Sequence, residues 1–130
     1  MKVFPNGFPS DFSLLAVIRA NQRYSRASVF TIYNSDSEES LILYIGTEIS
    51  LLYQDETLVE DNLVNFNAST NDMQWHRIAI SVKGDSITLI FDCATQITKR
   101  LTRSPSSQIS TGGLIFMGVQ LDEEEEYFTV

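Results

Sequence analysis

Two residues that could do chemistry stand side by side at the start of the segment DMQWHRIAISV (72–82). His76 is the only histidine of the chain, and Trp75 is the only tryptophan. A histidine can serve as a general base or a metal ligand because it changes charge near neutral pH. Nucleophilic catalysis would also need a serine or cysteine in a local signature such as G-x-S-x-G, and the sequence has none. Strand parity puts His76 on the side of Ile78 and Ile80, so we expect its side chain to point inward or toward an end of the sheet.

The single cysteine, Cys93, has no second cysteine in the chain with which to form a disulfide. One cysteine and one histidine are too few ligands for a structural zinc site. A lone cysteine is usually a small buried residue or a free thiol, and in a secreted protein it suggests a partner outside the segment.

A run of acidic residues extends from Asp122 to Glu126. Glu123 and Glu125 would share a face of a strand, where they could act as the paired carboxylates of a glycosidase. Four consecutive glutamates with no aromatic sugar platform between them are more typical of a solvated turn. We therefore expect no catalytic residue in this run and no enzymatic activity in the chain.

The basic residues Lys99, Arg100 and Arg103 lie close together in the segment TKRLTR. Arginine and lysine can bind sulfated glycans through charge-assisted hydrogen bonds, and the family resemblance described below implies this role for the three residues. The alternative is a solvated strand edge, where basic side chains prevent pairing with another chain.

The triplet NAS at 67–69 makes Asn67 an N-glycosylation acceptor if the chain is secreted. It lies in the polar stretch NASTND, which is typical of a surface loop. Such triplets also occur by chance.

The composition is that of one globular domain. The chain has 130 residues, 43% of them hydrophobic, and a net charge of −8 that comes mostly from the acidic run. An acidic domain does not attract nucleic acid. No stretch approaches the ~18 apolar residues of a membrane span, and the N-terminus MKVFPNGFPSDF is not a signal peptide. Either the chain is cytosolic or it is a piece of a longer, secreted protein.

The hydrophobic periodicity predicts strands and little else. Runs rich in β-branched and aromatic residues alternate with turn signals, a pattern typical of a β-sandwich or barrel. The second face of the hairpin built from 77–82 and 86–93 around KGD is also half apolar, which favours a strand covered on both sides or at a sandwich edge. The window 55–66 is predicted to be an ordered loop with at most one helical turn. The predicted strands are 12–19, 27–34, 40–46, 48–54, 77–82, 86–93 and 112–119.

Eight short motifs occur in the order expected of one family. They are FPSDFSLL (8–15), VFTIYN (29–34), SLLYQD (50–55), WHRIAISV (75–82), ITLIFDC (87–93), TKRLTRS (98–104), GGLIFMG (112–118) and LDEEEEYF (121–128). Together they resemble a thrombospondin N-terminal-like domain, which is a laminin-G-like, concanavalin-type β-sandwich of jelly-roll form. The resemblance is closest to the amino-propeptide of fibrillar collagens of the type V and XI group, and it covers nearly the whole chain.

The resemblance implies an all-β antiparallel sandwich over 1–130. Members of the family normally have a further strand and a cysteine before FPSDF, and an apolar final strand and more cysteines after the acidic stretch. The chain therefore resembles a single domain truncated at both ends, with the disulfide partner of Cys93 outside it. In this family Trp75 and His76 would be a structural strand start. Laminin-G-like relatives often hold calcium at a loop rim, but no ligand set can be assigned here.

The function implied is that of a non-catalytic extracellular matrix module of a fibrillar collagen-like chain. Such a module regulates fibril assembly by its bulk and binds matrix proteins, while other collagen chains join through regions outside this segment. The alternative is a heparan-sulfate-binding adhesion or signalling module of a thrombospondin-type glycoprotein. Both imply a secreted protein of the matrix.

Overall fold

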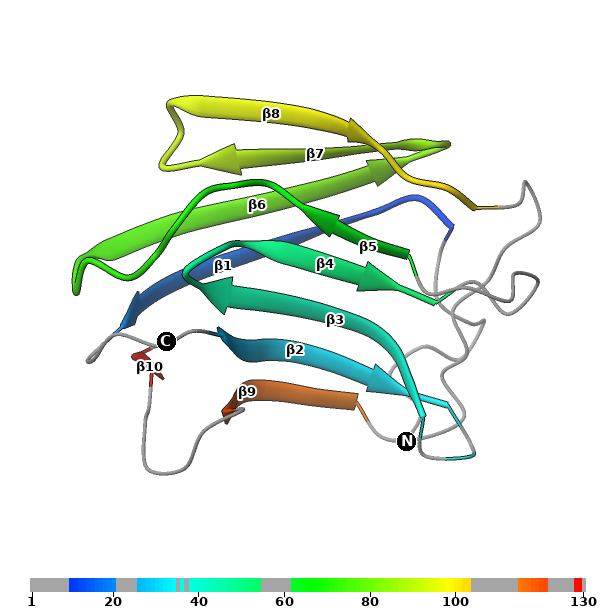
Figure 1. The fold of residues 1–130 in the computed structure, drawn as a ribbon, viewed down its shortest axis with the longest axis horizontal. Helices are drawn as coiled ribbons and strands as arrows, with labels where there is room; N and C mark the ends of the chain where they lie inside the picture. The colour runs from blue at the N-terminus through cyan, green and yellow to red at the C-terminus, as the bar shows by residue number, and fades with distance from the viewer. Residues whose placement is uncertain are drawn as a thin grey trace.

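The residues that the structure describes form ten β-strands in a computed structural model (Figure 1). The structure describes residues 10–20, 26–34, 36, 38–54, 62–103, 115–121 and 128–129. The strands are β1 (Phe12–Ala20), β2 (Arg26–Tyr33), β3 (Glu39–Gly46), β4 (Ser50–Tyr53), β5 (Asn62–Asn65), β6 (Trp75–Lys83), β7 (Ser86–Phe91), β8 (Thr95–Arg100), β9 (Ile115–Leu121) and β10 (Phe128–Thr129).

The strands form two five-stranded antiparallel sheets that face each other. The β1 sheet has the order β10-β1-β6-β7-β8, and the β3 sheet has the order β5-β4-β3-β2-β9. Sequential strands pair in the hairpins β6–β7 and β7–β8, whereas β1 pairs with the distant β6 and β2 with the distant β9. The predicted all-β antiparallel class is therefore confirmed.

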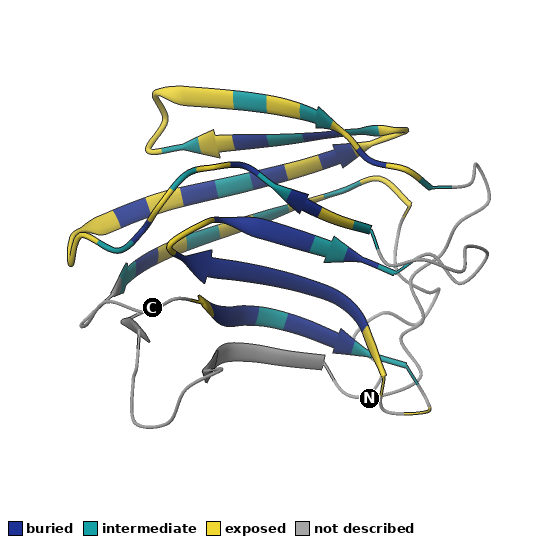
Figure 2. Cartoon of the chain, in the orientation of Figure 1, coloured by how far each residue is buried: buried dark blue, intermediate teal, exposed yellow. Residues whose placement is uncertain are grey.

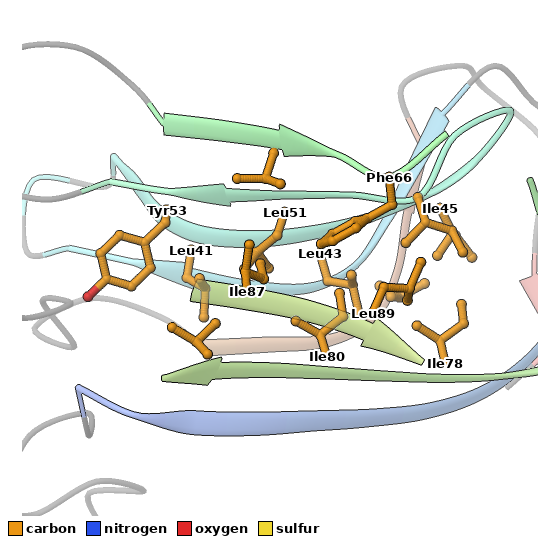
Figure 3. Close-up of a cluster of buried hydrophobic side chains, with 14 of the residues drawn as sticks. Leu41, Leu43, Ile45, Leu51, Tyr53, Phe66, Ile78, Ile80, Ile87 and Leu89 are labelled. Carbon is orange, nitrogen blue, oxygen red and sulfur yellow. The ribbon is translucent and has the colours of Figure 1, made fainter. Parts of the chain in front are cut away.

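The core lies between the two sheets (Figure 3). Alternate residues of each strand point inward because successive side chains of a strand face opposite ways. Ile78, Ile80 and Leu89 of the β1 sheet have no exposed surface, and neither do Leu51 and Tyr53 of the β3 sheet. Burying one such aliphatic side chain stabilises the fold by about 1.5–3 kcal/mol.

All seven predicted strands are present, with shifted ends. The strand predicted to reach Cys93 stops at Phe91, because Asp92 and Cys93 have φ values of 53° and 58° and turn the chain toward β8. The connection KGD is a two-residue turn, since Lys83 still pairs with Ser86. Gly84 begins that turn with φ of 58°, a conformation that glycine adopts without steric cost.

Three strands were not predicted, namely β5, β8 and β10. β5 falls inside the predicted loop at 55–66, so the loop is wrong for residues 62–65, while 55–61 lie outside the described residues. β5 has only two apolar residues, and its conformation comes from pairing with β4. β8 reads TQITKR, whose polar composition hides a strand that pairs along its whole length with β7.

The two sheets differ in how far the residues on their outward faces, turned away from the core, are buried. Every residue of β3 after Glu39 is buried, whereas exposed and buried residues alternate along β6 (Figure 2). The prediction that the hairpin 77–93 is covered on both sides or lies at an edge is wrong. β6 and β7 are internal strands, and their outward residues Arg77 and Ile90 are exposed.

Candidate functional site

His76 lies between two carboxylates at one end of the β1 sheet. Its Nδ1 is 2.7 Å from Oδ2 of Asp92, and its Nε2 is 2.7 Å from Oδ1 of Asp72. Asp72 comes from the turn before β6, and Asp92 from the turn after β7. The ring of Phe91 stacks on the imidazole at a centroid distance of 4.9 Å. Only 6% of His76 is exposed, so the three side chains form a compact charged cluster.

The geometry of this cluster requires a protonated histidine. An ionised carboxylate only accepts hydrogen bonds, so both ring nitrogens must carry a proton to donate to both partners. Burial lowers the pKa of His76, but the hydrogen bonds to Asp92 and Asp72 raise it more, and the pKa lies above its usual 6.5. For Asp72 the effects have the opposite signs. Burial raises the pKa of its carboxyl group, but the hydrogen bonds from His76 and from the Gln74 backbone lower it more, so that the pKa lies below 3.8. The surroundings of His76 therefore favour its protonated form.

This arrangement is unsuited to general-base catalysis. A base needs a nitrogen that substrate can reach, and each ring nitrogen of His76 already lies 2.7 Å from a carboxylate oxygen. Strand parity correctly places His76 on the buried side, while its structural role stays a prediction. Trp75 takes the outward position and is 50% exposed, with the Arg19 guanidinium 5.3 Å from its ring centroid, so it does not belong to the core.

Asp92 also stabilises the turn between β7 and β8 by hydrogen bonds to the backbone of β6. Its Oδ1 accepts a hydrogen bond from the Arg77 backbone at 2.8 Å, and its own amide donates to the Arg77 carbonyl at 2.8 Å. Sequence reasoning missed Asp72 and Asp92 as partners of His76. The register of the hairpin around Gly84 was the available signal, because it sets Asp92 opposite the beginning of β6.

Arg103 forms the other polar cluster, near the opposite end of β6. Its guanidinium donates to the carbonyls of Ser10 and Gly84, to the hydroxyl of Tyr53 at 3.2 Å and to the carboxylate of Asp11 at 2.9 Å. Only 5% of its side chain is exposed. The hydrogen bond from the Gly84 amide lowers the pKa of Asp11, burial raises it, and the hydrogen bond from Arg103 lowers it, so that the pKa lies below its usual 3.8. Arg103 thus ties the start of β1 to the β6–β7 turn and to the β3 sheet.

The structure does not bring the three candidate glycan-binding residues together. Lys99 follows Ile97 on the inward-facing side of β8, and Arg100 points outward. Arg103 is buried and its donors are used within the protein. A shared glycan site at these three positions is therefore not supported by their placement.

Replacing Arg103 with alanine is expected to lower the melting temperature by several degrees, because two carbonyls and a carboxylate lose their donors. Arg100→Ala, on the exposed face of the neighbouring strand, is expected to change it little. Arg103→Lys should fall between them, since lysine keeps the charge but not the planar fork. Thermal unfolding followed by circular dichroism measures all three, and equal effects of the two alanine variants would contradict the described cluster.

Two further candidates, Asn67 and Cys93, lie between strands. Asn67 is exposed with φ of 56°, and its backbone amide donates a hydrogen bond to Oδ1 of Asn65 at 2.9 Å. Cys93 is a free, exposed thiol and not a buried one. Glu123 and Glu125 lie outside the described residues.

Within the described ranges, no group of three or more His, Cys, Asp or Glu side chains is placed to hold a metal ion. The same residues include no helix that could cross a bilayer.

The sequence matches the Laminin G domain family over residues 24–128. It is also 25% identical over 104 residues to the human collagen alpha-1(XIX) chain, an alignment that covers 72% of this chain and 9% of that protein. The chain therefore spans a small part of this curated relative.

Solved structures share the fold at low sequence identity. The CBM40 domain of the Ruminococcus gnavus IT-sialidase superposes with a TM-score of 0.60 at 8% identity, covering 84% of this chain and 64% of that one. The LG1-3 region of the laminin alpha2 chain gives 0.56 at 17% identity, covering 84% and 22%. The alginate lyase of Klebsiella pneumoniae gives 0.53 at 9% identity, covering 91% and 55%. These likenesses show a laminin-G-type jelly-roll sandwich, and the family match over most of the chain shows that it belongs to the laminin G domain family.

Proposed function

We propose that the chain is a non-catalytic extracellular matrix module of a collagen-type protein. The observation that carries the proposal is the combination of a laminin G domain with a collagen relative. The charged cluster around His76 supports a binding or structural role over a catalytic one, because its nitrogens are saturated by Asp72 and Asp92.

The finer proposal is that the module regulates fibril assembly. Its bulk would project from a fibril surface and limit lateral growth, and it would bind matrix proteins. The motif resemblance to the type V and XI amino-propeptides supports a fibrillar chain, and the relationship to collagen XIX supports a collagen chain in general. The same proposal includes further features. The protein is secreted and carries a glycan on Asn67, Cys93 forms a disulfide with a cysteine outside this segment, and the domain lacks terminal strands.

The proposal is tested by fusing the chain to the amino end of a fibril-forming collagen. Fibrils assembled from the fusion are expected to be thinner than fibrils of the same collagen without it, as measured by electron microscopy. Fibrils of unchanged diameter would contradict the regulatory role. The alternative remains a heparan-sulfate-binding module of thrombospondin type, for which Lys99 and Arg100 point to opposite sides of β8 and the side chain of Arg103 is 5% exposed.

A further inference from the structure

The outward side of the β1 sheet has a charge opposite to that of the whole chain. Inward residues of its strands alternate with outward ones, and none of the outward residues of β1, β6, β7 and β8 is acidic, although the chain has a net charge of −8. Four of them are basic. The outward residues, called the outer face below, are Ser13, Leu15, Val17, Arg19, Trp75, Arg77, Ala79, Ser81, Lys83, Ser86, Thr88, Ile90, Gln96, Thr98 and Arg100.

The centre of the outer face is apolar. Leu15, Ala79 and Ile90 stand in one row across β1, β6 and β7. Leu15 is 77% exposed, Val17 44% and Ile90 38%. Together with Arg77 and Cys93 these residues line a shallow hollow of about 160 Å³. Water is in contact with aliphatic side chains here, at a cost of about 25 cal/mol for each Å² of apolar surface.

Basic residues lie at both ends of this apolar centre. At one end Arg77 stands opposite Val17, and Arg19 lies over the ring of Trp75. At the other end are Lys83 and Arg100, each opposite Ser86 in the register. A row of hydroxyls separates this second pair from the centre, with the oxygens of Thr88 and Thr98 3.0 Å apart. The surface therefore has an apolar middle with a basic rim at the Arg19 and Arg77 end, while at the other end the exposed carboxylate of Asp11, just before β1, offsets part of the charge of Lys83.

We propose that the outer face is a docking surface for an acidic segment of another protein. Apolar side chains of the partner would cover Leu15, Ala79 and Ile90, and its carboxylates would pair with Arg19 and Arg77. Protein interfaces commonly join an apolar centre to a polar rim, and complementary charge selects the partner. The proposal rests on the proposed function only in that a matrix module must have partners.

Two other occupants match the outer face less well. A sulfated polysaccharide would have to cross the aliphatic row between the two basic ends, where it finds no donor for its sulfates. Two copies of the chain could not pair outer face to outer face without placing like charges together. The chemistry that fits both the row and the rim is a polypeptide carrying carboxylates beside apolar side chains.

Fluorescence anisotropy with labelled polymers tests the proposal on the 130-residue chain. The probe is a random copolymer of glutamate and tyrosine, and the comparison polymers are polyglutamate and heparin of similar length. We expect the copolymer to bind about tenfold more tightly than polyglutamate, because only it can cover the apolar row. Binding of both acidic polypeptides should weaken as salt is raised.

Variants locate the binding surface. Leu15→Ser combined with Ile90→Thr should remove the preference for the copolymer, and Arg19→Gln combined with Arg77→Gln should weaken both acidic polypeptides. Leu63→Ser is the matched control, because Leu63 is 50% exposed but lies on β5 in the other sheet. It should leave binding unchanged. Circular dichroism confirms that each variant is folded.

Three results would overturn the proposal. They are equal affinity for the copolymer and polyglutamate, binding of heparin alone, and self-association of the chain that Leu15→Ser abolishes in sedimentation experiments. The outcome is separable from that of the fibril experiment. If the fusion thins fibrils while the copolymer does not bind, the outer-face proposal fails and the fibril proposal stands. If the copolymer binds while the fusion leaves fibril diameter unchanged, the fibril proposal fails and the outer-face proposal stands.

Discussion

Replacing Leu89 with alanine is expected to lower the free energy of unfolding by about 2–5 kcal/mol. Leu89 has no exposed surface and stands opposite Ile80 and Ile97 on the side of the β1 sheet that faces the β3 sheet (Figure 3). Removing its side chain takes away apolar burial and leaves a cavity that both sheets line. Small domains are stabilised by only about 5–15 kcal/mol, so this one change would remove a large share. Urea denaturation followed by circular dichroism measures it.

The matched control for that experiment is Leu63→Ala. It makes the same chemical change on β5, where half of the side chain is already in water. The expected loss is below about 0.5 kcal/mol, as for most surface substitutions. Equal losses at the two positions would mean that the sheets do not pack against each other through Leu89.

Raising the pH from about 6 to about 9 is expected to remove the stabilisation supplied by His76. The folded pKa of His76 lies above its usual 6.5, so its contribution is fully present below about pH 6.5 and is lost as the pH rises through the folded pKa. A neutral imidazole can donate to only one of Asp72 and Asp92. The difference in unfolding free energy between the protein and His76→Gln should therefore shrink across this range.

A direct measurement of the pKa is available because the chain has a single histidine. Proton NMR titration of the His76 ring should give a midpoint above 6.5, and Asp72→Asn should move it downward while leaving Asp92 in place. A midpoint at or below 6.5 would contradict the two-carboxylate geometry. On the acid side the folded pKa of Asp72 is lowered, so its contribution is present above about 3.8 and is lost as the pH falls through that lowered value.

Most of the fold could be predicted from the sequence because the central strands have strong apolar alternation. Ile78, Ile80 and Val82 identify the core side of β6 without any structure. Of the three strands that escaped prediction, β5 and β8 are ones whose own residues do not favour a strand. Pairing with β4 and β7 decides their conformation, and a single sequence carries no direct signal of such pairing.

The sites were harder to predict because they are made by residues that come together only in the folded chain. Asp72 is four positions from His76, but Asp92 reaches it through the β6–β7 register. Arg103 was grouped with Lys99 because the two are near in sequence, whereas in the fold it contacts Ser10 and Asp11 at the other end of the chain. The outer face combines residues of four strands, so neither its lack of acids nor its apolar row is visible until the registers are known.

The pairing of β1 with β6 and of β2 with β9 has a consequence for synthesis of the protein. As the chain leaves the ribosome, β1 appears first but has no partner in its sheet until β2 to β5 have already emerged. β2 can pair with β3 at once, yet its other side has no partner until β9 has been made. Long-range pairing of this kind slows folding and leaves strand edges exposed in the meantime. The nascent chain is therefore expected to depend on chaperones until the last strands are made.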